Sequence, residues 1–181
     1  MARDVLAKGL CWSSFRIGGD VSSLHAAVEL YRGLLQCLRP PNHPGLWLLH
    51  FNLGTCTGDL YQETNDIKYL TEGLDCCQCA FGMVDHRNPN RMCLALSLVN
   101  SLHMRYERLG AMEDLYGSIG VLKSCVNTPH DLHMQIIRAL AYSLSLRYDA
   151  LGMIDNLEEG IGLLRKAYIG AKTARHERDL S

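Results

Sequence analysis

One short pattern occurs four times along the chain, and this periodicity restricts the possible folds more than any other feature. The copies start at Gly19, Asn65, Gly110 and Gly152, so their spacings are 46, 45 and 42 residues. The five prolines, at positions 40, 41, 44, 89 and 129, fall between these starts, and proline breaks helices and marks connections. A period of this length with proline-bearing loops is typical of arrays of stacked helical units.

Each copy reads as a tight turn followed by a helix with one apolar face. Glycine or asparagine at the start supplies the left-handed residue that ends a preceding helix, and Asp20 and Asp66 stand where an N-cap belongs. A leucine five residues after the start is followed three residues later by a small residue, which favours a close helix crossing. These repeat positions are Leu24 and Ala27, Leu70 and Gly73, Leu115 and Ser118, and Leu157 and Gly160.

An aromatic residue precedes each start by four positions and marks the last turn of a first helix. The four aromatics are Phe15, Tyr61, Tyr106 and Tyr148, and we expect them to pack between stacked pairs. We predict first helices at 3–17, 45–63, 90–108 and 131–150, and second helices at 20–38, 66–83, 112–125 and 154–172. The fold is therefore expected to be an all-α solenoid of four antiparallel helix pairs. Its units would span about 1–43, 44–88, 89–129 and 130–172, with a frayed tail at 173–181.

Composition agrees with helices and restricts the class of partner. The chain has 30 leucines but only 15 valines and isoleucines together, and branching at Cβ disfavours helix. The formal net charge is -1, so no strong field attracts nucleic acid or anionic lipid. No apolar run is long enough to cross a membrane. We expect an intracellular protein with reduced cysteines that binds neither nucleic acid nor membranes.

The motifs resemble the tetratricopeptide repeat. Leu53-Gly54 in a first helix, a turn, and then a leucine and a small residue in a second helix follow that family's order. The segments Arg105-Tyr106-Glu107-Arg108-Leu109-Gly110 and Asn127-Thr128-Pro129-His130 look like the long-period arrays of mushroom-forming fungi. The resemblance implies a right-handed superhelix that binds protein segments. Such arrays often accompany CHAT peptidase domains, for which the four helix pairs leave no room.

Two clusters of cysteine and histidine side chains could carry chemistry, and each also has a structural interpretation. Cys76, Cys77 and Cys79 could supply part of a zinc site, but no second Cys-x-x-Cys or His-x-x-x-His pair accompanies them. They also stand inside a predicted helix, which favours core packing. His130 and His133 are interpreted as a solvated first turn. No nucleophile elbow or phosphate-binding glycine pattern is present, so we expect no catalytic residue, metal or cofactor.

Arginine recurs one residue before the aromatic and could form a ladder on one face of the array. We name Arg105, Arg138 and Arg147 as candidate partner contacts; the alternative is pairing within the chain, with Glu107, Asp149 or Glu113. The leading hypothesis is a non-enzymatic scaffold that binds a peptide or protein on its concave helical face. One alternative is an oligomerising or regulatory part of a larger CHAT- or nucleotide-binding-domain protein, with self-association through the array ends. An enzyme or metal-binding protein on a helical scaffold is a minor third.

Overall fold

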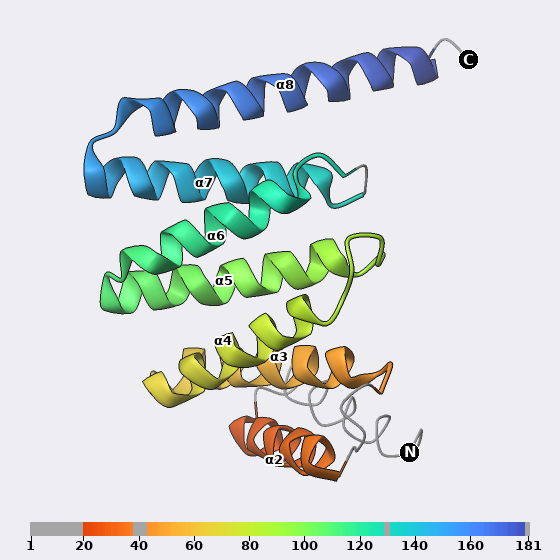
Figure 1. The fold of residues 1–181 in the computed structure, drawn as a ribbon, viewed down its shortest axis with the longest axis vertical. Helices are drawn as coiled ribbons and strands as arrows, with labels where there is room; N and C mark the ends of the chain where they lie inside the picture. The colour runs from red at the N-terminus through yellow and green to blue at the C-terminus, as the bar shows by residue number, and fades with distance from the viewer. Residues whose placement is uncertain (1–19, 38–42, 129–130, 180–181) are drawn as a thin grey trace. The chain divides into compact units, whose positions relative to one another are not determined.

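The structure is a computed structural model that describes residues 20–37, 43–128 and 131–179, with side chains up to residue 170. Over these residues it is all-α and contains no strand, which confirms the expected class (Figure 1). The expected first helix at 3–17 and the repeat residue Phe15 lie outside the described residues. The helices are α2 (Val21–Cys37), α3 (Leu46–Thr64), α4 (Ile67–Gly82), α5 (Arg91–Leu109), α6 (Met112–Cys125), α7 (His133–Leu151) and α8 (Ile154–Asp179).

The turns between paired helices form as the pattern predicts. Asn65, Gly110 and Gly152 have φ values of 55°, 69° and 68°, the left-handed region that glycine and asparagine tolerate best. The backbone N–H of each donates to the carbonyl of the tyrosine four residues earlier, with a donor–acceptor distance of 2.7 Å in all three turns. The recurring start residue therefore ends one helix and redirects the chain into the next.

The helix ends agree with the predicted ends to within about two residues, except at the end of α8. Asp20 and Asp66 accept from the backbone N–H groups of Ser22 and Lys68 at 3.0 and 3.1 Å, as N-caps do. The predicted end of the last second helix at residue 172 is wrong, because α8 continues to Asp179. Residues 171–179 contain no proline or glycine and several good helix formers, so nothing in them ends the helix.

The chain divides into two compact units, residues 1–101 and 102–181. In the first unit α2 packs on α3, and α3 packs antiparallel on α4 (Figure 1). A core cluster that includes Leu24, Leu53 and Leu60 joins α2 to α3. Arg32 of α2 makes a bidentate ion pair with Glu72 of α4, with Nε 2.8 Å from Oε1. One apolar core and one half-buried ion pair thus join three successive helices of this unit.

In the second unit, the last part of α5 is followed by α6, α7 and α8. Consecutive helices run antiparallel, and α7 packs against both α6 and α8 (Figure 1). Leu115, Ile119 and Leu122 of α6 and Ile136, Leu140 and Leu144 of α7 are buried. No helix of the described chain is long and apolar enough to cross a membrane.

The crossing of α3 and α4 depends on two glycines. A Cβ at Gly54 would lie 3.0 Å from the Gly73 carbonyl oxygen and 2.8 Å from the Cys77 Sγ. A Cβ at Gly73 would lie 2.8 Å from Oγ1 of Thr57, a fully buried hydroxyl held by the carbonyls of Leu53 and Gly54. The same repeat position in α8 is looser, because a Cβ at Gly160 would lie 3.5 Å from the nearest atom, the Ala141 carbonyl oxygen.

Gly73 and Gly160, which occupy the same repeat position, should therefore respond in opposite directions to substitution by alanine. Gly160→Ala should raise the free energy of unfolding by up to about 1 kcal/mol through helix propensity. Gly73→Ala should lower it by about 1–2 kcal/mol, because overpacking against Thr57 outweighs that gain. Urea unfolding followed by circular dichroism measures both. Equal stabilisation by the two substitutions would contradict the close crossing of α3 and α4.

Candidate functional site

An open groove lies between α7 and α8 in the second unit. Its volume is about 320 Å³. Most of its wall is apolar, and Arg138 and Ser145 of α7 add polar groups. The lining residues are Arg138, Ala141, Tyr142 and Ser145 from α7 and Leu157, Gly160, Ile161 and Leu164 from α8. A groove of this composition suits an apolar side chain of a protein segment better than a small charged metabolite.

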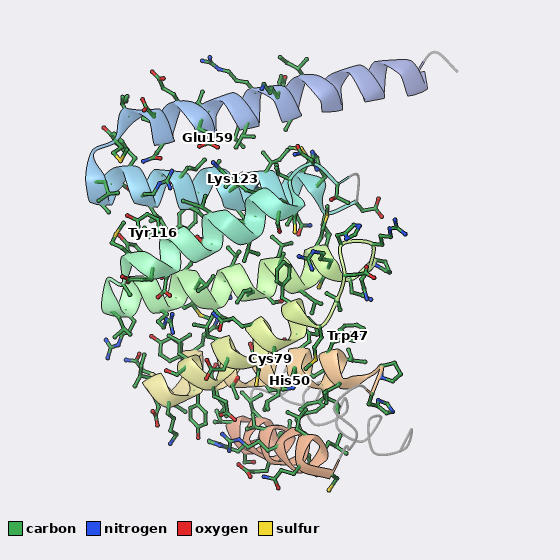
Figure 2. The ribbon with its side chains drawn as sticks, viewed as in Figure 1. Trp47, His50, Cys79, Tyr116, Lys123 and Glu159 are labelled. Carbon is green, nitrogen blue, oxygen red and sulfur yellow. The ribbon has the colours of Figure 1, made fainter. Side chains whose placement is uncertain are left out.

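Local folding fixes the walls of this groove. The left-handed turn at Gly152 reverses the chain, and α8 then returns along α7. Gly160 of α8 faces the backbone of Ala141 of α7, where an added Cβ would lie at ordinary van der Waals distance. An ion pair between Lys123 Nζ of α6 and Glu159 Oε1 of α8, 2.7 Å apart, also links α8 to α6 (Figure 2). The groove thus lies between two helices with a defined spacing.

The face of α8 that lines the groove is more exposed than the same repeat positions of the other described second helices. In α2, α4 and α6 the residues five, nine and twelve positions after the start are at most 4% exposed. At the same positions of α8, Leu157 is half-buried, Ile161 is 42% exposed and Leu164 is 41% exposed. These buried residues are Leu24, Val28 and Tyr31 in α2, Leu70, Leu74 and Cys77 in α4, and Leu115, Ile119 and Leu122 in α6. An apolar stripe that is buried in three helices is therefore open in α8.

Two of the three candidate arginines are occupied within the chain. Arg105 Nε of α5 donates to both carboxylate oxygens of Asp114, at 3.1 and 2.9 Å, and that carboxylate is almost fully buried. Arg147 Nε of α7 donates to Asn156 Oδ1 at 3.0 Å. In each case the partner is the residue nine positions later, at the start of the paired helix. These contacts join the two helices of a pair.

Arg138 differs from the other two arginines because it is exposed and lines the groove. The three arginines named as candidate partner contacts therefore have different surroundings. Its position beside Tyr142 puts a positive charge and an aromatic face at the rim of one apolar groove. Contact of Arg138 with a partner remains a prediction.

Most of the remaining repeat positions are buried wherever they are described. Seven of them are buried: Leu24, Ala27, Leu70, Gly73, Leu115, Ser118 and Gly160. Tyr61, Tyr106 and Tyr148 are only half-buried, and their backbone carbonyls receive the turn N–H. Leu157 departs from the other leucines and reaches the groove.

A buried polar cluster joins α5, α6 and α7. His103 Nε2 lies 2.8 Å from Ser143 Oγ, and the Ser118 hydroxyl donates to Ser143 Oγ at 3.2 Å. Ser118 and Ser143 are inaccessible to solvent, so no substrate reaches a nucleophile there. Burial lowers the pKa of His103, and the charge of Glu107 partly opposes this. The cluster is suited to packing, with a neutral imidazole at its centre.

The cysteines that resemble a partial zinc site divide into two groups. Cys76 and Cys77 are buried, and burial raises the pKa of their thiols to about 12 and about 11. Cys79 and Cys93 are exposed. Within the described ranges no group of three or more His, Cys, Asp or Glu side chains is placed to hold a metal ion. The core interpretation therefore applies to Cys76 and Cys77 alone.

Sequence reasoning missed the partners Asp114 and Asn156 and the groove residues Tyr142 and Leu164. The spacing of nine residues from Arg105 to Asp114 and from Arg147 to Asn156 is visible in the sequence. It was not informative, because a contact across a turn depends on the crossing geometry of two helices. Exposure of Leu164 carries no sequence signal, since apolar residues also occupy that repeat position in buried helices.

The second arginine contact is chemically incomplete, and this predicts a stabilising substitution. Asn156 is buried, and its Nδ2 has no hydrogen-bond partner. Asn156→Asp should supply the carboxylate that Arg105 already has and raise the free energy of unfolding at pH 7 by about 1 kcal/mol. The reciprocal Asp114→Asn should lower it by about 2 kcal/mol. Denaturant unfolding tests both, and a destabilised Asn156→Asp would show that Arg147 cannot use a second oxygen.

The lowered pKa of His103 predicts a pH dependence. The unfolded chain binds a proton at this imidazole at higher pH than the folded chain does, so stability should fall as pH drops below about 6.5. His103→Gln should reduce the slope of unfolding free energy against pH between about 7.5 and 5, whereas His86→Gln, in an exposed loop, should not. Unchanged slopes in both variants would contradict the burial of a neutral His103.

No family model, curated protein or solved structure matches this chain. The groove is therefore interpreted from its own residues. Its defining features are the open stripe on α8, Tyr142 and the exposed Arg138.

Proposed function

We propose that this protein is a non-enzymatic interaction module, a tetratricopeptide-like array of helix pairs that binds a segment of another protein chain. The observation that carries the proposal is the open apolar stripe of α8, whose counterparts in α2, α4 and α6 are buried. An apolar stripe that other repeats cover with a helix is suited to receive a helix. The proposed binding site is the groove between α7 and α8.

The chemistry of the groove defines the segment that would fit it. Ile161, Leu164 and Tyr142 offer apolar and aromatic surface, which favours an amphipathic helix with aliphatic anchors. Arg138 at the rim favours an acidic side chain on that helix. Arg105 and Arg147 contribute by holding the helix pairs in position.

A non-enzymatic role is supported by the chemistry of the reactive side chains. The serine–histidine contact between Ser143 and His103 is buried, and Cys76 and Cys77 have raised pKa values. The runner-up, an oligomerising or regulatory part of a larger protein, uses the same groove and differs in the identity of its occupant. An intracellular location remains part of the proposal.

Selection of helical peptides on the full chain tests this function. A displayed library of amphipathic helices should yield binders with micromolar dissociation constants. Tyr142→Glu and Ile161→Glu should each weaken those binders at least tenfold, since a charge in the apolar groove removes anchor burial.

Tyr116→Glu is the matched control, because Tyr116 is similarly exposed but lies on α6 outside the groove (Figure 2). It should change binding less than about twofold, well under the tenfold that 1.4 kcal/mol represents. Circular dichroism confirms that each variant is folded. Failure to select any binder would remove the function for other partners, and equal loss in all three variants would overturn the groove as the peptide-binding site.

A further inference from the structure

The exposed face of α8 has the spacing of a coiled-coil seam. Ile154, Leu157, Ile161, Leu164 and Tyr168 follow one another at intervals of three, four, three and four residues. That alternation places all five on one helix face and is the a/d pattern through which two helices pack. Apart from the half-buried Leu157 they are exposed, Tyr168 by 68%. We call this face the α8 seam.

The charges beside the α8 seam are arranged so that one helix complements a reversed copy of itself. Glu158 and Arg165 are both exposed and stand seven residues apart, each directly after a d-type residue, at the e position. On the opposite edge the g positions are Gly160 and Ala167, which carry no charge. In an antiparallel pair, e residues face e residues of the other helix, whereas in a parallel pair they face g residues. Only the antiparallel arrangement therefore brings Glu158 of one helix to Arg165 of the other.

We propose that the partner in the α7–α8 groove is a second copy of this chain, whose α8 packs antiparallel against α8 along the α8 seam. This rests on the proposed function and names its ligand. With the two-fold axis midway between Ile161 and Leu164, each Ile161 faces the other copy's Leu164, and each Leu157 faces the other copy's Tyr168. Two identical Glu158–Arg165 pairs lie on one flank.

The size of the α8 seam indicates a reversible dimer. From Ile154 to Tyr168 the seam is about 21 Å long at 1.5 Å per residue, which is two heptads. Tyr142 and Arg138 of α7 extend the apolar surface on one side. Such a contact lies at the lower end of specific interfaces, so association should depend on concentration in the micromolar range.

Sedimentation velocity of the full chain over a range of about 5–300 µM tests the proposal. The weight-average mass should rise from the 20.3 kDa monomer towards twice that value. Ile161→Lys should weaken association at least tenfold, because it places two like charges at the axis. Tyr116→Lys, the control on α6, should change it less than about twofold, a factor far below tenfold. A chain that stays monomeric throughout, or a dimer that tolerates Ile161→Lys, overturns the proposal.

Charge exchange tests the antiparallel orientation. Glu158→Arg and Arg165→Glu should each weaken the dimer by about three- to tenfold, since each variant turns both symmetry-related pairs into like charges. The double variant should restore association to within about twofold of the original chain, because both pairs are re-formed. Single variants without effect, or a double variant weaker than either single one, would overturn the antiparallel packing.

The two proposals fail separately. Glu158 and Arg165 do not line the groove, so their exchange should leave peptide binding intact. A monomeric chain that still binds selected peptides overturns the second-copy assignment and leaves the interaction function standing. A dimer that is sensitive to Ile161→Lys, with no peptide binder selected, supports self-association and removes the function for other partners.

Discussion

The packing of the described chain depends on one requirement, that the apolar faces of the second helices α4 and α6 are covered on two sides. One face of each packs against the preceding first helix, and the next first helix covers the other. Ser143 of α7 reaches both Ser118 of α6 and His103 of α5 in this way. In the first unit Ser101, at the same repeat position, lies 3.9 Å from Cys77 Sγ of α4. The left-handed turn, the small residue and the buried apolar stripe together allow this packing.

The residue types at one contact between paired helices differ from pair to pair, although the contact occupies the same positions. The residues five before and four after the start are Arg105 and Asp114 in one pair and Arg147 and Asn156 in the next. In the α3–α4 pair the same positions hold Leu60 and Tyr69, which belong to one apolar cluster. An ion pair, a polar contact and an apolar contact thus occupy the same place between two helices. The first helices α3, α5 and α7 all have 19 residues although the chemistry of this contact differs among their pairs.

Much of the fold could be predicted from the sequence because its boundaries are set by local chemistry. Left-handed residues such as Asn65 and Gly152 and caps such as Asp66 act over a few residues, so helix ends were predicted closely. The end of α8 was not, since residues 171–179 lack an apolar period although they favour helix. The site was less predictable. Arg138 was named, but Tyr142 and Ile161 were not, because sequence does not show which apolar stripe lacks a covering helix.

The boundary between the two compact units falls inside α5, after Ser101. A single continuous helix therefore contributes its first part to one unit and its last part to the other. Local opening of either unit would release one half of α5 and leave the other half with a newly frayed end, because helix formation is cooperative. The backbone hydrogen bonds of one helix thus link the folding equilibria of the two units, so destabilisation on one side should lower hydrogen-exchange protection on the other.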